Sequence, residues 1–262
     1  MSGRIWAIAL NTFREAARIR VVYGIIGVVF VSNMFALACG QLSIHEEARV
    51  ARDIGLAGIS FFGGVTAIIL GVFLLYTEVQ RRTIHAIVSK PIDRWEFVVG
   101  KYVGMALLLS VLVALFGGAM MVMLVLQGSG VSETVVKALL LSWCEVLTIA
   151  AIAIFFSSFS SPFLSALFAA AMWLIGRLTP DIENAARSST TAIQWTTKVA
   201  LEITPDLHLF SISGQTVDGN HVSVNADFVS WAYVATSALH GLGWVVGLLA
   251  FAALLFHRRD FV

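Results

Sequence analysis

The chain has 262 residues, of which 58% are hydrophobic and only 13% are charged, and its formal net charge is +1. An ordinary soluble domain carries about 25% charged residues, and one core of this length could not bury so much apolar surface. The composition excludes disordered, collagenous, coiled-coil and disulfide-rich secreted classes. The near-zero net charge argues against a nucleic-acid partner. The sequence therefore predicts a polytopic membrane protein.

Apolar segments close to the ~20 residues that a helix needs to cross a bilayer recur along the chain. The six predicted spans are residues 22–40, 56–77, 103–126, 135–156, 162–178 and 229–256. Their apolarity is unbroken, whereas the strands of a barrel would alternate with period two. We therefore expect an all-α fold with six transmembrane helices in a single transmembrane domain over residues 1–262.

Residues 3–20 precede the first span and predict an amphipathic helix in the headgroup plane. On a helical wheel its apolar side carries Ile5, Trp6, Ala9, Leu10, Phe13, Ala16 and Ala17. The polar side carries Asn11, Arg14, Glu15 and Arg18. An alternative interpretation is a plain anchor that leads into the first span.

The first span has a rival interpretation, because Ala36-Leu37-Ala38-Cys39 faintly resembles a lipoprotein cleavage site. The apolar run is longer than a typical signal core and begins only after about 20 residues that include Glu15, which favours a retained span. Cys39 and Cys144 both fall within predicted spans, so a disulfide between them is not expected.

The loop 78–102 between the second and third spans is rich in charge but contains a short apolar stripe, Ile84, Ile87 and Val88, at helical spacing. Pro91 ends that helix, and Asp93 with Glu96 suits a capping-box start for the next one. A short cytoplasmic helix with an apolar face is what a docking site for a partner requires. A plain basic loop is the alternative.

Polar residues are rare within the predicted spans, where only Lys137, Glu145 and Arg177 are charged. A lone carboxylate in a span is costly unless it is paired or hydrated, so Glu145 is either a polar point in a transport path or a locally paired structural residue. Arg177 and His240 are its candidate partners. The Gly100/Gly104 and Gly243/Gly247 pairs have the spacing that lets helices approach closely, within the subunit or across a dimer.

The outer loop 179–228 is the longest segment outside the predicted spans. Thr179-Pro180-Asp181 predicts the start of an amphipathic helix that continues to about residue 203, and Val217 to Asn220 predicts a tight turn or a short hairpin. This loop is either a cover for the exit of a path, a site for an extracytoplasmic accessory protein, or a solvated linker.

The placement of Lys and Arg predicts the orientation. With the N-terminus inside, the inner segments hold 11 Lys and Arg in 57 residues, whereas the outer segments hold four in 73. We therefore expect both termini in the cytoplasm.

Motifs along nearly the whole chain resemble those of the six-helix permease subunits of ABC-type exporters, the ABC type-2 transmembrane family. They are Asn11 to Glu15 with Arg18 and Arg20, Glu46-Glu47 with Arg49, Tyr76 and Glu78, Arg82-Thr83-Ile84, Ser89 to Ile92 with Arg94, Glu96-Phe97, Gly100-Lys101, Pro205-Asp206-Leu207 and Arg258 to Phe261. The resemblance implies a type V exporter-like architecture. Two permease subunits, identical or homologous, would work with two cytoplasmic ATPase subunits.

The resemblance also implies roles for individual residues. The ATPase-coupling contacts would be Glu78, Arg81, Arg82, Ile84, Ile87 and Lys90, with Arg14 and Glu15 in the connecting helix and Ser157 to Pro162 as a minor contact. The second and fifth spans would line the substrate path at the dimer interface. The residues expected on that path are Phe61, Phe62, Phe73, Met172 and Trp173.

Catalytic motifs are not found in the sequence. Gly100-Lys101 lacks the upstream glycine of a phosphate-binding loop, and position 49 is Arg where a zinc-protease helix that begins at His45-Glu46 needs His. We therefore expect no metal or cofactor on this chain, with ATP and Mg²⁺ bound by the partner ATPase.

The leading hypothesis is the permease of an ABC exporter in a bacterial cytoplasmic membrane, in contact with lipid and moving a lipophilic or amphipathic cargo. The alternatives are a membrane assembly or anchoring factor that uses the same ATPase, and an intramembrane enzyme.

Overall fold

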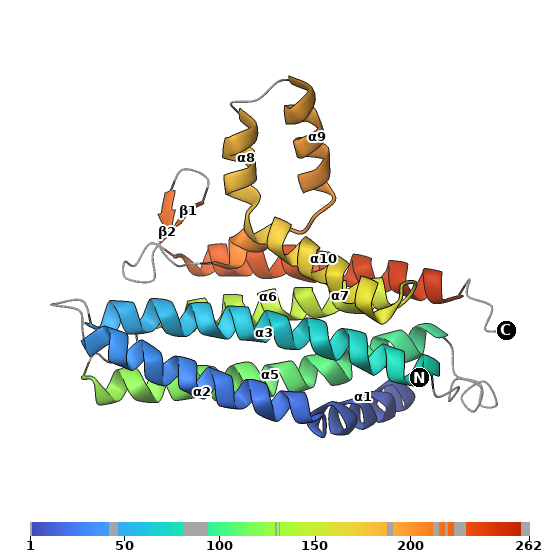
Figure 1. Ribbon diagram of the computed structural model, residues 1–262, viewed down its shortest axis with the longest axis horizontal. Helices are drawn as coiled ribbons and strands as arrows, with labels where there is room; N and C mark the ends of the chain where they lie inside the picture. The colour runs from blue at the N-terminus through green and yellow to red at the C-terminus, as the bar shows by residue number, and fades with distance from the viewer. Residues whose placement is uncertain are drawn as a thin grey trace.

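The computed structural model describes residues 2–41, 47–80, 94–128, 130, 132–187, 191–211, 215–217, 220–222 and 229–257. Long helices account for most of them (Figure 1). The α-helices are α1 (Ser2–Ala17), α2 (Arg20–Gln41), α3 (Glu47–Gln80), α5 (Arg94–Leu126), α6 (Glu133–Ser157), α7 (Pro162–Arg177), α8 (Thr179–Arg187), α9 (Thr191–Glu202) and α10 (Trp231–His257). A 3-10 helix, η1 (Leu207–Phe210), and two short strands, β1 (Gln215–Val217) and β2 (Asn220–Val222), complete the described elements.

Four segments of these helices are long and apolar enough to cross a membrane: Ala51–Leu74, Trp95–Leu126, Glu133–Ser157 and Trp231–Leu255. Two further helix pairs, α1 with α2 and α7 with α8, are long and apolar enough only when the two helices of a pair are taken as one span. In each pair the chain bends by 65° between the two helices. The described residues therefore form a helical membrane protein with four to six candidate spans. The 16 residues of α7 rise only about 24 Å, less than the ~30 Å hydrocarbon core, so this helix cannot cross alone.

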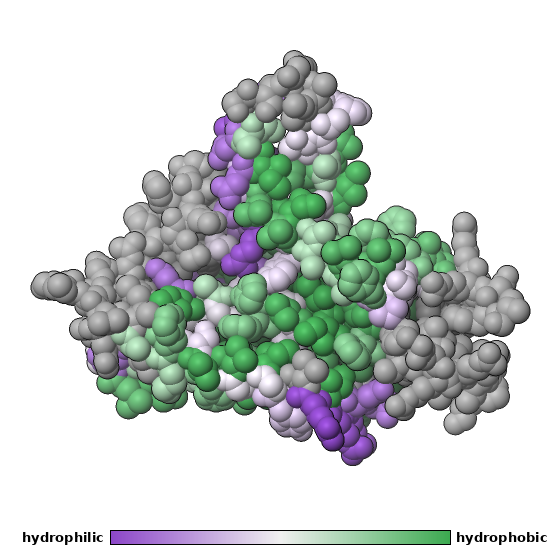
Figure 2. All heavy atoms as spheres, viewed as in Figure 1, coloured by the Kyte–Doolittle hydropathy of each residue, from purple (hydrophilic) through white to green (hydrophobic). Residues whose placement is uncertain are grey.

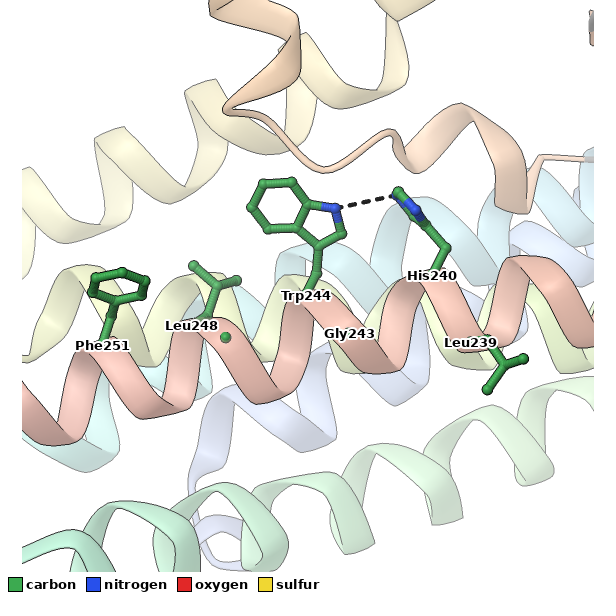
Figure 3. Close-up of a pocket in the computed structure, with 7 residues that line it drawn as sticks. Leu239, His240, Gly243, Trp244, Leu248 and Phe251 are labelled. Carbon is green, nitrogen blue, oxygen red and sulfur yellow. Dashed lines mark hydrogen bonds between the residues drawn. The ribbon is translucent and has the colours of Figure 1, made fainter.

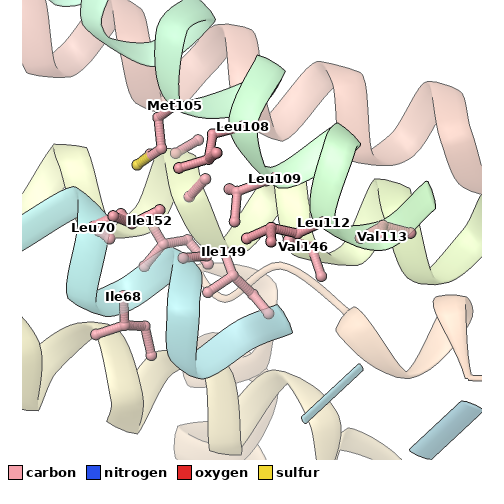
Figure 4. Close-up of a cluster of buried hydrophobic side chains, with 14 of the residues drawn as sticks. Ile68, Leu70, Met105, Leu108, Leu109, Leu112, Val113, Val146, Ile149 and Ile152 are labelled. Atoms are coloured by element: carbon pink, nitrogen blue, oxygen red, sulfur yellow. The ribbon is translucent and has the colours of Figure 1, made fainter. Parts of the chain in front are cut away.

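Helices α3 and α6 are the centre of the bundle. In Figure 1 the long helices run side by side, and α3 contacts α2, α5, α6 and α7 while α6 contacts α3, α5, α7 and α10. Figure 4 shows the buried side chains where α3, α5 and α6 meet, including Leu70, Leu109 and Ile149. Lipid is as apolar as such side chains, so close packing rather than exclusion of water holds these helices together.

Small residues allow α3 and α6 to approach closely. A Cβ atom at Gly71 of α3 would lie 2.5 Å from the Cβ of Ala153 on α6, and one at Gly63 would lie 2.7 Å from a methyl carbon of Val146. Ala150, Ala151 and Ala153 of α6 are all fully buried. Larger side chains at these positions would separate the two central helices.

Helix α1 packs against α5. Its buried side is Ala9, Thr12 and Ala16, whereas Trp6, which the sequence placed on the same apolar side, is 53% exposed. A Cβ at Gly100 of α5 would lie 2.8 Å from the Cβ of Ile8, and one at Gly104 would lie 2.6 Å from the Cβ of Thr12. The Gly100/Gly104 pair therefore packs within the subunit, as one of the two sequence interpretations required. The helix ends at Ala17, short of the predicted residue 20.

The outer loop 179–228 differs from its prediction. Instead of one amphipathic helix to about residue 203, α8 and α9 are separate helices that contact each other, and the break between them falls at residues outside the described part. The short hairpin expected at Val217 to Asn220 agrees with the antiparallel pair β1 and β2, in which Val217 is paired with Asn220.

We predict that Gly104→Ala lowers the thermal unfolding midpoint of the detergent-solubilised protein, because overpacking typically costs about 1–3 kcal/mol. Gly243→Ala is the matched control: no described atom lies within 4 Å of a Cβ there, and Ala favours a helix over Gly. Equal midpoints for the two variants would show that α1 does not depend on its close approach to α5.

Candidate functional site

A buried ion pair lies at the centre of the bundle, where α3, α6 and α7 meet. The Glu145 residue of α6 is 1% exposed. The Arg177 guanidinium, at the end of α7, lies 3.0 Å from Oε1 of Glu145 and donates a hydrogen bond to Oγ of Ser60 on α3, 2.7 Å away. The Ser60 hydroxyl donates in turn to Oε2 of Glu145. The three side chains form a closed triad that joins three helices.

The depth of this triad follows from the position of Glu145, which is twelve residues from each end of α6 (133 to 145 and 145 to 157). If α6 crosses the bilayer, the carboxylate lies near its midplane, where an isolated charge is most costly. The Arg177 guanidinium neutralises the charge of the carboxylate. Together with the Ser60 hydroxyl it also gives each carboxylate oxygen a hydrogen-bond donor, and these contacts offset the cost of burial.

A small cavity of about 20 Å³ adjoins the triad. Its polar lining residues are Ser60, Ser142, Glu145, Arg177 and Ser211. Its apolar lining residues are Leu56, Ala57, Ala138 and Phe210. This volume has room for about one water molecule. The cavity is far too small for a cargo, and whether Glu145 also serves a transport path stays a prediction.

The sequence identified Glu145 and offered two partners for it. The structure pairs it with Arg177, whereas His240 on α10 accepts a 3.2 Å hydrogen bond from the indole N–H of Trp244 (Figure 3). These two residues line an open groove of about 380 Å³ along α10 that also includes Gly243 and Gly247. Ser60 was not identified, because a serine in an apolar run gives no signal without its neighbours in space.

The predicted path residues lie on α3 and α7. The ring of Phe61 lies 5.3 Å from that of Phe62 and 5.7 Å from that of Trp173, between ring centroids. Phe61 is 53% exposed and Phe73 is 50% exposed, while Met172 is partly buried against the core. Phe61, Phe62 and Trp173 thus form one aromatic group, and Phe73 lies more than three turns further along α3. Their role in a path stays a prediction.

The predicted coupling residues divide between described and undescribed parts of the chain. On α1, Arg14 is exposed and Glu15 is partly buried. Arg81, Arg82, Ile84, Ile87 and Lys90 lie outside the described residues, and Glu78 is in the last turn of α3 with no described side chain. Ser158, in the predicted minor contact, is buried and donates to the Phe155 carbonyl.

Lys101 lies within the predicted loop 78–102 and, although it was not among the predicted coupling residues, it connects α5 to α1 and α3. Its residue is 2% exposed, and its Nζ donates to the carbonyl of Leu74 on α3 at 3.1 Å. The same atom lies 3.6 Å from Oε2 of Glu15 on α1. A buried lysine on α5 therefore ties α1 to the last turns of α3.

The third charged residue of the predicted spans, Lys137, joins the beginnings of α6 and α10. Its Nζ lies 2.9 Å from the carbonyl oxygen of Val229 and 2.8 Å from Oε1 of Glu133. Trp231 donates its indole N–H to the same Glu133 oxygen at 2.6 Å. Lys137 thus belongs to a contact between helix ends, not to the central triad.

Comparison with known families identifies the architecture. The profile of the ABC-2 family transporter proteins matches residues 6–261. The chain belongs to this family. No curated protein matches it. Family membership, together with the apolar helices, makes the chain a multi-pass membrane permease of an ABC transporter, and such permeases work with ABC ATPase subunits.

We predict that Glu145→Ala destabilises this ABC-2 permease by about 1.5–3 kcal/mol, the range for a hydrogen bond to a charged group, because it removes the acceptor shared by the partly buried Arg177 guanidinium and the Ser60 hydroxyl. The double variant Glu145→Met with Arg177→Met removes both charges and is expected to recover most of the loss. Thermal unfolding in detergent measures both. A double variant no more stable than Glu145→Ala would mean that the ion pair is not what the single substitution disrupts.

We further predict that Lys101→Met weakens the contact between α1 and α3, while Lys101→Arg retains it. The expected result is faster proteolysis within α1 for Lys101→Met, measured by limited digestion in detergent, with Lys101→Arg close to the unmodified chain. Identical digestion of all three proteins would contradict the assigned role of Lys101.

Proposed function

We propose that this ABC-2 permease is the membrane subunit of an ATP-driven exporter and works as a dimer with two cytoplasmic ATPase subunits. The family match over residues 6–261 is the observation that carries the proposal. ATP and Mg²⁺ would be bound by the ATPase subunits, and this chain would not be an enzyme. Both termini would be cytoplasmic, in a bacterial inner membrane, with six membrane spans in all.

The contacts of α3 support a route for the coupling. Lys101 donates to the carbonyl of Leu74, in the last turns of α3, and also lies close to Glu15 of α1. Ser60, fourteen residues earlier (60 to 74), is held by Glu145 and Arg177. A helix of this length spans about 21 Å. A push from the ATPase on residues 78–102, whose middle part would be the coupling helix, would thus reach the bundle centre through one rigid element.

The surface of α3 and α7 supports a lipophilic or amphipathic cargo. The exposed side chains there are apolar, including Phe61 at 53% on α3 and Leu167 at 53% and Leu174 at 58% on α7. Two copies that face each other through this surface would enclose an apolar path between them. An apolar path desolvates an apolar cargo at little cost, whereas a polar cargo would lose its hydration without replacement.

The test is to purify the tagged permease with its natural partners and to identify what accompanies it. We predict a stoichiometric ABC ATPase that is lost in Arg82→Glu with Ile84→Asp and retained in Arg82→Lys with Ile84→Val. Reconstituted in vesicles, the complex should show ATPase activity that a lipophilic cargo stimulates, and that cargo should move. An absent ATPase partner would overturn the proposal.

The second candidate function is an assembly or anchoring factor for the same ATPase. It predicts the same co-purification but neither stimulation of ATPase activity by cargo nor movement of cargo in vesicles. In the exporter, Glu145→Gln should reduce the stimulated ATPase activity more than the basal activity, because the triad lies next to the proposed path.

A further inference from the structure

The connection between α1 and α2 carries three arginines, which we call the basic bend. Arg14 lies in the last turn of α1, Arg18 follows the end of that helix, and Arg20 is the first residue of α2. All three residues are exposed. In Figure 2 a strongly hydrophilic patch lies on the lower side of the molecule, at the place where α1 joins α2 in Figure 1.

The described part of the chain gives the basic bend no counter-ion. No described carboxylate forms an ion pair with Arg14, Arg18 or Arg20. Glu15 is the only acidic residue between positions 2 and 41, and its Oε2 lies 3.6 Å from Nζ of Lys101 on α5. Arg14 and Arg18 are also four residues apart, a spacing at which like charges repel each other. The positive charge of the bend therefore calls for an anion from outside the subunit.

The packing of α1 sets the level of the basic bend relative to the membrane. Helix α2 has 22 residues and rises about 33 Å, which is enough to cross a bilayer without α1. The chain bends by 65° between α1 and α2, so α1 lies closer to the membrane plane than to its normal when α2 crosses upright. On α5 it packs against Gly100 and Gly104, beside residue 103, where the third predicted span begins. The basic bend therefore lies at the border between hydrocarbon and headgroups.

Exposed aromatic residues lie around the same border. Trp6 of α1 is 53% exposed, Tyr23 in the first turn of α2 is 63% exposed, and Trp95 at the beginning of α5 is 41% exposed. Trp and Tyr favour membrane interfaces, where the ring meets hydrocarbon and the polar atom meets headgroups. A docked ATPase surface would not account for an exposed Tyr23 on the spanning helix, whereas lipid headgroups account for both the aromatic residues and the arginines.

We propose that Arg14, Arg18 and Arg20 bind the phosphate groups of anionic phospholipids in the leaflet beside α1. A guanidinium is always charged and donates two parallel hydrogen bonds to phosphate oxygens. A zwitterionic lipid also has a phosphate, but its own cation cancels much of the attraction, so the net negative charge of the lipid sets the preference. Helix α1 is then held by α5 on one side and by the leaflet on another. The inference requires that the chain spans a membrane and does not require that it exports a cargo.

Lipid binding to the purified full chain in detergent tests the proposal, by native mass spectrometry with phosphatidylglycerol and phosphatidylcholine of identical acyl chains. The double variant Arg14→Gln with Arg18→Gln is compared with Arg187→Gln with Lys198→Gln, which removes the same charge from exposed positions of α8 and α9. The expected preference for phosphatidylglycerol falls about 25-fold in the first variant, or about five-fold for each arginine. In the second variant it stays within about two-fold of the unmodified chain.

A further variant separates the loss of charge from a loss of fold. Arg14→Lys with Arg18→Lys keeps both charges and should keep most of the preference, and all variants should bind phosphatidylcholine as the unmodified chain does. An equal loss of preference in the two glutamine variants, or an unchanged preference in Arg14→Gln with Arg18→Gln, would overturn the proposal. Inorganic phosphate that displaces phosphatidylglycerol at equal concentration would overturn it in favour of a soluble anion. Loss of a co-purifying ATPase with unchanged lipid preference would overturn it in favour of an ATPase contact.

Discussion

The fold depends on one buried carboxylate. Glu145 lies at the middle of α6, a largely apolar helix, and Arg177 and Ser60 reach it from two other helices. The Glu145 carboxylate accepts from both Arg177 and Ser60, so the triad links α3, α6 and α7 to one another. The triad adds a polar contact, which lipid cannot replace, to the close packing of small residues between α3 and α6.

The same triad explains the unusual shape of the fifth apolar segment. Helix α7 is too short to cross a bilayer, and its last residue is the arginine that binds Glu145. The chain then turns aside into the α8–α9 hairpin and returns through η1, whose Phe210 lines the cavity beside the triad. The Arg177–Glu145 ion pair thus holds the end of α7, and with it the beginning of α8, near the centre of the bundle.

Hydropathy alone predicted the long helices, because their apolar runs are continuous over lengths that match a bilayer. It also placed the fifth apolar segment at 162–178 and the start of the next helix at Thr179, close to α7 and α8, but it treated as a full span a helix of 16 residues that is too short to cross alone. Glu145 was identifiable because a solitary carboxylate in an apolar run has few explanations. Ser60 and Lys101 were not, since their roles arise from contacts 85 and 27 residues away in sequence. The predicted coupling residues 81, 82, 84, 87 and 90 lie outside the described residues.

We propose that α3 transmits the closure of the two ATPase subunits from Lys101 to the middle of the bundle. The most direct measurement is the distance between spin labels at Phe61→Cys in the two copies of the reconstituted complex, with Cys39 and Cys144 replaced, with and without ATP. The account predicts that ATP shifts this distance in the otherwise unmodified permease and leaves it nearly unchanged in Lys101→Met. A distance that ATP does not alter, or a shift that Lys101→Met leaves intact, would contradict the account.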